Sequence, residues 1–219
     1  MNVSEILSRS SAFPLLGAFA LYFLVGSFLP TFLAWVLVGS VFATAVIPVW
    51  QHRVRAILVL STGVVGLTLC AAGVTEKNAS LIAPGLALLA VQITTVVAVI
   101  LSAFLRLRDV SSNAIAGAVA GYLLLGFLWA ALFGLVEIAF PGSLTYEGLP
   151  LGGREDPLGD VVYYSYVTLT TVGYGDVVPQ PGPARSLAIL EAASGQLYIA
   201  IVVAGLVGRY AMKRGEQAD

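Results

Sequence analysis

Six long apolar runs constrain this chain more than any other feature of its sequence. Apart from Glu137 in the fifth run and Glu191 in the sixth, they carry no charged side chain. The runs cover residues 11–29, 31–50, 56–74, 81–105, 114–140 and 186–208. Each approaches or exceeds the ~20 apolar residues that an α-helix needs to cross a bilayer. We therefore expect an all-α membrane protein with six transmembrane helices.

The composition excludes several classes of protein. Hydrophobic residues make up 58% and charged residues 11% of the chain, against about 45–50% and about 25% in soluble domains. A single cysteine, Cys70, and a single histidine, His52, offer neither an intrachain disulfide nor a Cys/His metal cluster. The net charge of −1 predicts no nucleic-acid partner.

The distribution of basic residues predicts the orientation in the membrane, because Lys and Arg collect on the cytoplasmic side. With both termini cytoplasmic, the inner side holds Arg9, Arg53, Arg55, Arg106, Arg108, Arg209, Lys213 and Arg214. The outer side then holds Lys77, Arg154 and Arg185. We expect a multi-pass protein of the plasma membrane, or of the inner membrane if the source is bacterial, surrounded by membrane lipids.

The longest outer segment, residues 141–185, separates the fifth and sixth runs and contains an apolar stretch of its own. Asp156 is suited to cap a helix that Pro157 starts, with Asp160 in the first turn. We expect this re-entrant helix to end near Thr170, so that its partly negative C-terminal end points into the membrane centre. Irregular backbone at that depth requires burial in protein or a water-filled path.

A five-residue string follows this helix: Thr171, Val172, Gly173, Tyr174 and Gly175. It resembles the TVGYG selectivity filter of potassium channels, in which carbonyl oxygens replace the water shell of the ion. Gly173 and Gly175 adopt positive φ without strain, which allows neighbouring carbonyls to face one side. The resemblance implies that all five residues, Gly175 included, form the potassium-binding filter, and that Thr171, Val172, Gly173 and Tyr174 hold the ions. Since one strand cannot surround an ion, we expect a homotetramer.

The resemblance extends to residues that support the filter. Tyr163 and Tyr164 stand where voltage-gated-type potassium channels carry an aromatic cuff, and their hydroxyls are candidates to hydrogen-bond Tyr174 or Asp176. Glu137 matches a glutamate that braces the outer helix in that type. A bracing role is favoured over ion binding, because charge near the membrane boundary is costly.

The last run resembles a pore-lining inner helix with two candidate gating residues. Gly195 lies 22 residues after Gly173, the spacing of the gating hinge in these channels, and either a bend or close packing explains a glycine there. Glu191 is either a carboxylate that touches the ion path or a hydrogen-bond partner for the back of the re-entrant helix. The second interpretation is favoured.

The front of the chain lacks a voltage sensor. Such a sensor needs several Arg or Lys in its fourth helix, and residues 81–105 carry no charge. We therefore divide the chain into a sensor-like four-helix domain, 1–110, and a pore domain, 111–219. The short connection between the fourth and fifth runs predicts that the front domain packs against the pore of its own subunit.

The sequence thus predicts a potassium-selective channel that conducts passively, without intrinsic voltage sensing and with no cofactor besides the potassium ions in the filter. A potassium transporter with a channel-like filter and a nonselective cation channel remain alternatives. An enzyme is not expected: Ser194 with Gly195 is the one pair suggestive of an intramembrane hydrolase, and His52 lies on a distant loop.

Overall fold

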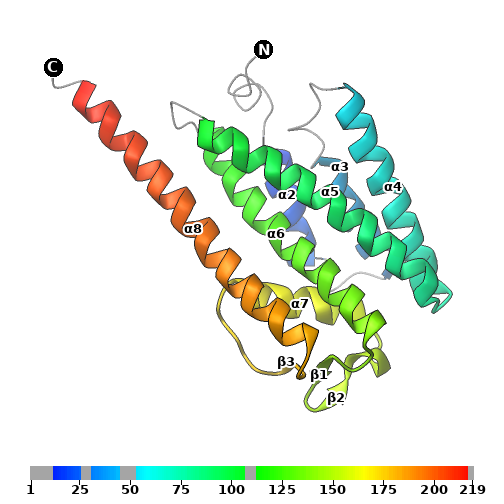
Figure 1. Cartoon of the computed structure of the whole chain (residues 1–219). Coiled ribbons are helices and arrows are strands. Elements are labelled where there is room, and N and C mark those ends of the chain that lie inside the picture. Colours follow the sequence, from blue (N-terminus) through cyan, green and yellow to red (C-terminus); the bar gives the residue numbers. More distant parts are fainter. Residues whose placement is uncertain (1–11, 26–30, 45–52, 107–111, 217–219) are drawn as a thin grey trace. The chain divides into compact units, whose positions relative to one another are not determined.

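The computed structural model describes residues 12–25, 31–44, 53–106 and 112–216. The seven α-helices in this part are α2 (Phe13–Val25), α3 (Thr31–Thr44), α4 (Arg53–Thr75), α5 (Ala79–Arg106), α6 (Ser112–Ala139), α7 (Pro157–Leu169) and α8 (Pro183–Glu216) (Figure 1). The remaining elements are the strands β1 (Leu144–Tyr146), β2 (Leu149–Pro150) and β3 (Val177–Pro179), and the 3-10 helix η3 (Leu151–Gly153).

Four helices are long and apolar enough to cross a membrane, over Ala56–Thr75, Ala79–Leu105, Ser112–Ala139 and Pro183–Gly205. They correspond to the last four predicted runs, and the protein is a mostly helical, multi-pass membrane protein. The first two runs contain α2 and α3, which are described over 13 and 14 residues. Residues 26–30 and 45–52 lie outside the described part of the chain, so the count of six spans stays a prediction.

The chain forms two compact units. The first contains residues 1–64, 94–123 and 198–219, and the second contains residues 65–93 and 124–197. The helices α4, α5, α6 and α8 each contribute to both units. The functional division predicted from the sequence, 1–110 and 111–219, remains a prediction.

The first unit is held together by helix packing and by two hydrogen bonds between segments that are distant in sequence. The helices α2 and α3 pack against each other, as their closely spaced apolar runs suggest. The backbone amide of Ala12 donates to Asn113 Oδ1 at 2.7 Å, which ties the start of α2 to the start of α6. Tyr198 Oη of α8 donates to the Ala118 carbonyl of α6 at 2.8 Å.

In the second unit, α4 and α5 form a tight hairpin. The side chain of Asn78 accepts a hydrogen bond from the amide of Ser80 at 3.0 Å and so caps the start of α5. Small residues allow the two helices to approach closely. A Cβ added to Gly85 would lie 2.6 Å from Cys70 Sγ and 2.9 Å from the Gly66 carbonyl oxygen.

The three strands form one antiparallel sheet in the order β2-β1-β3, which the sequence analysis did not anticipate. In β1, Thr145 lies opposite Val178 of β3 and opposite Pro150 of β2. The sheet contributes Leu144 and Val177 to a core of buried residues: Ala130, Phe133, Leu144, Leu151, Val161, Tyr164, Val177 and Ala184. The sheet and this core join the end of α6, the helix α7 and the start of α8 into one body.

Candidate functional site

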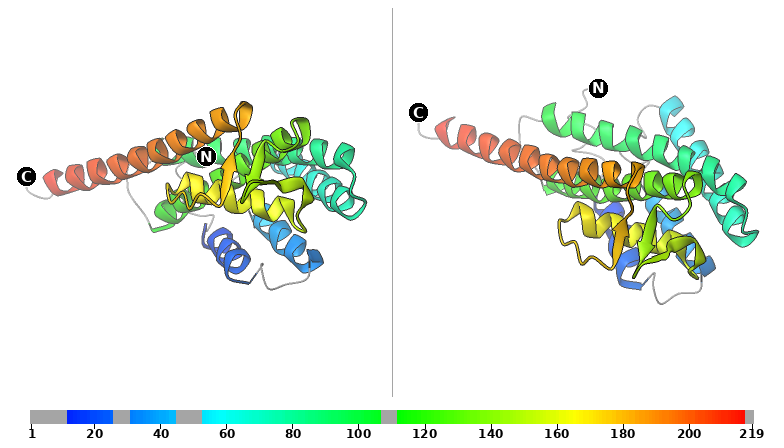
Figure 2. Two further views of the ribbon diagram at one scale, coloured as in Figure 1. Left: turned by 90° about the horizontal axis from the view of Figure 1, so that it is seen from below. Right: turned by 60° about the horizontal axis from the view of Figure 1, so that its bottom comes forward.

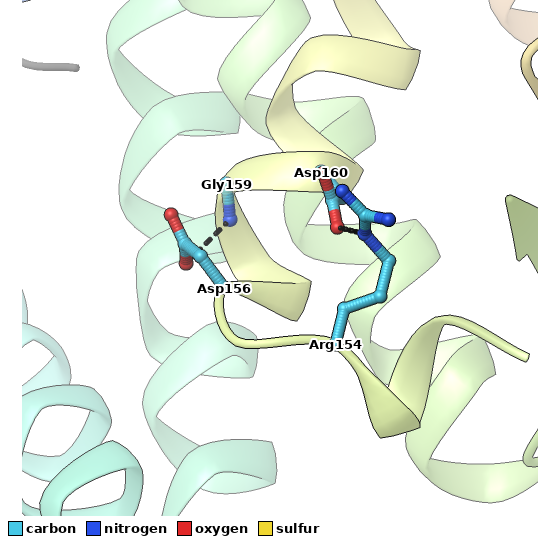
Figure 3. Close-up of polar contacts among 4 residues, drawn as sticks. All are labelled: Arg154, Asp156, Gly159 and Asp160. Atoms are coloured by element: carbon cyan, nitrogen blue, oxygen red, sulfur yellow. Dashed lines mark hydrogen bonds and ion pairs between the residues drawn. The ribbon is translucent and has the colours of Figure 1, made fainter.

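The helix α7 starts as the sequence predicts. Asp156 Oδ1 accepts a hydrogen bond from the amide of Gly159 at 3.0 Å, and Pro157 occupies the first helical position (Figure 3). Asp160 in the first turn forms an ion pair with Arg154 (Figure 3). Carboxylates at the N-terminal end of a helix offset its partial positive charge. The predicted start of this helix is therefore confirmed, whereas its re-entry into the membrane stays a prediction.

The end of α7 holds the first residues of the filter string. The helix ends at Leu169, with Thr170 at its C-cap, which agrees with the predicted end. The carbonyl oxygen of Val167 accepts from two amides, that of Val172 at 3.0 Å and that of Gly173 at 3.2 Å. These bonds direct two filter amides back toward α7. The carbonyl groups that precede these amides in the chain are thereby turned away from the helix, since N–H and C=O of one peptide unit point in opposite directions.

The backbone of the filter string alternates in the sign of φ. Thr171, Gly173 and Gly175 have φ of 60°, 59° and 81°, whereas Val172 and Tyr174 are not among the positive-φ residues. In a regular strand, successive peptide groups point to opposite sides. Alternation between the right- and left-handed regions reverses every second peptide and brings the carbonyls to one side. The positive φ predicted for both glycines is confirmed, and that of Thr171 was not foreseen.

All five residues of this string are exposed within the single chain. Tyr174 exposes 72% of its surface and Val172 exposes 51%. The string connects α7 to β3, and Figure 2 shows it as an irregular loop.

The outer end of the string is fastened at Asp176. Tyr163 Oη donates to Asp176 Oδ2 at 2.7 Å, and the amide of Val177 donates to Asp176 Oδ1 at 2.9 Å. The carbonyl of Asp176 accepts from the amide of Glu147 at 3.0 Å, which links it to the turn between β1 and β2. The predicted hydrogen bond between Tyr163 and Asp176 is present.

The hydrogen bond between Tyr163 and Asp176 shifts the pKa of both residues. The hydrogen bond to the carboxylate raises the pKa of Tyr163 to about 12, with a smaller contribution from desolvation. The same bond lowers the pKa of Asp176. Both directions describe a neutral phenol that donates to an ionised carboxylate.

Tyr164 does not take part in this contact. Its ring packs edge-on against Phe133 at a centroid distance of 5.0 Å, and only 5% of the residue is exposed. Its hydroxyl is hydrogen-bonded to the side chain of Thr168. The expectation that both tyrosine hydroxyls reach Tyr174 or Asp176 is therefore corrected for Tyr164: adjacent helical side chains point about 100° apart, so only Tyr163 faces the filter.

The contacts of Glu137 are those of a bracing residue, the role that the sequence analysis favoured. Its Oε1 accepts from the amide of Gly142 at 2.8 Å. Its Oε2 accepts from Ser143 Oγ at 2.8 Å and from the amide of Leu144 at 2.9 Å. The carboxylate thus orders the turn that leads from α6 into β1.

The helix α8 packs closely against α7 at Gly195. A Cβ added there would lie 2.8 Å from both Leu169 Cδ1 and the Leu169 carbonyl oxygen. Close packing therefore explains this glycine, which lies within the uninterrupted helix α8.

Glu191 is completely buried, and it lies against α7, as the favoured interpretation of its role proposed. Its partner there is Ser165, whose Oγ lies 2.5 Å from Glu191 Oε1.

Three further contacts hold the site together and were missed in the sequence analysis. Ser165 Oγ also lies 2.7 Å from the Gly126 carbonyl oxygen of α6. Trp129 Nε1 donates to Ser194 Oγ at 3.0 Å. Gln180, the residue after β3, donates through Nε2 to Thr145 Oγ1 of β1 at 2.8 Å. The β-branched residues of 144–146 and 177–179 were the available signal for the strands; nothing local identifies the side-chain pairs.

Part of the chain is similar in sequence to known channel proteins. Residues 118–211 match the family model described as ion channel, which is somewhat under half of the chain. This segment is similar to the pore domain of ion channels. The rice (Oryza sativa subsp. japonica) protein named two pore potassium channel c is 33% identical over 69 residues. That alignment covers 32% of this chain and 14% of the relative. No solved structure matches this chain.

Proposed function

We propose that this protein is a potassium-selective channel whose filter consists of residues 171–175. The observation that carries the proposal is the alternation of φ along the string, with positive values at Thr171, Gly173 and Gly175. This conformation is what a row of carbonyl oxygens on one side of the chain requires. Carbonyl rings of this kind replace the hydration shell of potassium.

The surroundings of the string support the same function. The C-terminal end of α7 at Leu169 directly precedes it, and the partial negative charge of a helix C-terminus favours a cation. The Tyr163–Asp176 hydrogen bond at the outer end and the Val167 carbonyl at the inner end hold the string at both ends. The rice relative of this chain is named a potassium channel.

The channel is a homotetramer in this proposal, because one string cannot surround an ion. Two sets of exposed residues support assembly. The filter string itself is uncovered, and α8 exposes large apolar side chains such as Ile189 at 70% and Leu197 at 62%. Four copies around a common axis would cover the string and line the path with α8. Both termini are cytoplasmic, lipids surround the assembly, and α5 supplies no voltage-sensing charges between residues 81 and 105.

Reversal potentials test the proposal. The purified protein is reconstituted into planar bilayers with potassium on one side and sodium on the other. A reversal potential close to the potassium equilibrium value is expected, with rubidium carried and barium blocking. A reversal near zero would instead identify a nonselective cation channel and overturn the assignment of this filter.

A further inference from the structure

Ser165 joins three elements of the second unit through one hydroxyl group. Its Oγ lies 2.7 Å from the carbonyl oxygen of Gly126 in α6 and 2.5 Å from Oε1 of Glu191 in α8. Both distances are those of O–H···O hydrogen bonds. Ser165 itself belongs to α7 and is completely buried. The two hydrogen bonds of Ser165 thus connect α7, the helix before the filter, to α6 and to α8.

Few hydrogens are available for the two hydrogen bonds that Ser165 Oγ forms. A serine hydroxyl carries one hydrogen, and a backbone carbonyl oxygen only accepts. The contact with Gly126 therefore uses the hydrogen of Ser165. The hydrogen in the contact with Glu191 must then come from the carboxyl group, which has one only when it is protonated.

An ionised Glu191 would conflict with its surroundings. If Ser165 donated to the carboxylate, the Ser165 and Gly126 oxygens would face each other at 2.7 Å without a hydrogen between them. Glu191 Oε2 is buried and has no hydrogen-bond partner in the described part of the chain. A buried charge without a partner costs far more than a buried carbonyl oxygen.

The neighbouring groups do not supply a compensating charge. In the described residues, the ion pair present joins Arg154 to Asp160, and Glu191 forms none. The titratable group of α7 that faces Glu191 is the phenol of Tyr164, which is uncharged when protonated. Trp129 of α6 is nearby through Ser194 and does not titrate.

We propose that Glu191 is a neutral carboxylic acid that donates its proton to Ser165, and that this proton holds α7 in position behind the filter. Glu191 is a positioning residue: it acts on the filter through Ser165 and touches no ion. The role of the proton in conduction rests on the proposed channel function. The presence of the proton on Glu191 does not depend on that function. Loss of the proton would break the chain of hydrogen bonds and place a negative charge between α7 and α8.

Infrared spectroscopy on the purified protein tests whether the proton is present. At neutral pH we expect a carbonyl-stretch band of a protonated carboxylic acid that is absent in Glu191→Gln and moves on exchange into D₂O. Glu137, a half-buried carboxylate that accepts three hydrogen bonds, serves as the control, and Glu137→Gln should leave the band in place. If no band is lost in Glu191→Gln, the carboxyl group is ionised and the proposal is wrong.

Potassium flux into vesicles tests what the proton does. Glu191→Gln keeps a donor toward Ser165, so its flux should stay within about twofold of wild type, whereas Glu191→Ala and Ser165→Ala should lose roughly tenfold. From about pH 6 to about pH 9, between the ordinary carboxyl and phenol values of ~4.3 and ~10, wild-type flux should fall at the alkaline end. The Glu191→Gln flux should not.

The two experiments separate the two proposals. A protonated-acid band without potassium-selective flux would overturn the channel function and leave the proton in place. Selective flux without the band would overturn the proposal that Glu191 is protonated and would leave the channel function in place. A flux in Glu191→Gln that falls with rising pH as in wild type would show that another group, such as Tyr164, controls conduction, and would overturn the positioning role.

Discussion

Gly195 of α8 lies directly against Leu169, the last residue of α7: a Cβ at position 195 would meet the Leu169 carbonyl oxygen at 2.8 Å. Backbone atoms cannot move aside as a flexible side chain does. The base of the filter string, which begins two residues after Leu169, is therefore positioned by the absence of a side chain on α8. This relationship connects α8 to the start of the string 171–175.

Gly195→Ala should destabilise the protein and reduce potassium flux. Overpacking of this kind costs about 1–3 kcal/mol, so we expect a lower midpoint of thermal unfolding in detergent. Gly208→Ala in the same helix is the matched control, because no atom of the described residues lies within 4 Å of the added Cβ. That control should unfold at the wild-type temperature or slightly above, since alanine is the better helix former. Equal effects of both substitutions would contradict the packing argument.

Gly173→Ala should abolish selective conduction and leave membrane insertion intact. In the part of the chain that the structure describes, no atom lies within 4 Å of the added Cβ, but φ is +59° there. The effect is therefore backbone strain, about 1–2 kcal/mol, rather than a steric clash. Gly152→Ala is the control, with open space and no positive φ. A Gly173→Ala channel with unchanged potassium-over-sodium selectivity would refute the assignment of the filter.

Tyr163→Phe should loosen the outer end of the filter, because it removes the hydroxyl that donates to Asp176. We expect a shorter residence in the conducting state in single-channel records. Tyr164→Phe is the control, since that hydroxyl bonds to Thr168 and not to Asp176. It should leave the open durations unchanged.

The same contact predicts a dependence of stability on pH. The folded-state pKa of Asp176 is lowered, so its contribution is present above the ordinary value of ~3.9 and is lost as the pH falls through the lower folded value. The pKa of Tyr163 is raised to about 12, so its contribution is present below the ordinary value of ~10 and is lost as the pH rises through the folded value. The difference in unfolding temperature between wild type and Tyr163→Phe should therefore be largest between these limits. A difference that grows below pH ~3.9 would have the wrong sign.

Glu137→Gln should lower stability by about 1.5–3 kcal/mol, the size of hydrogen bonds to a charged group. The carboxylate accepts from two amides and one hydroxyl, and an amide NH₂ in place of one oxygen would face a donor. Glu147→Gln at the exposed turn between β1 and β2 is the control. Thermal unfolding followed by circular dichroism measures both. If the two variants unfold alike, the turn after α6 does not depend on Glu137.

The channel should open without steep voltage dependence. Each charge moved through the field contributes about 2.3 kcal/mol per 100 mV, and α5 carries none between residues 81 and 105. Open probability recorded between about −100 and +100 mV should change only weakly. A measurable gating-charge current would show that another segment moves charge across the membrane.

Local rules determined several features of this protein directly from the sequence. Asp156 and Pro157 set the start of α7, and the glycines at 173 and 175 take positive φ, because capping, proline geometry and the missing Cβ act within a few residues. The four long spans follow from apolar length alone. None of these depends on how the chain folds back on itself.

Other features were decided by contacts between distant segments. Tyr163 and Tyr164 are adjacent residues of the same type, yet Tyr163 faces Asp176 and Tyr164 packs on Phe133. The packing of α7 decides which side of the helix is buried. The pairing of β1 with β3 spans more than thirty residues and leaves no local trace. Ser165 became the partner of Glu191 for the same reason: a buried carboxyl group requires a hydrogen bond, and only the packing of α7 between α6 and α8 determines which group provides it.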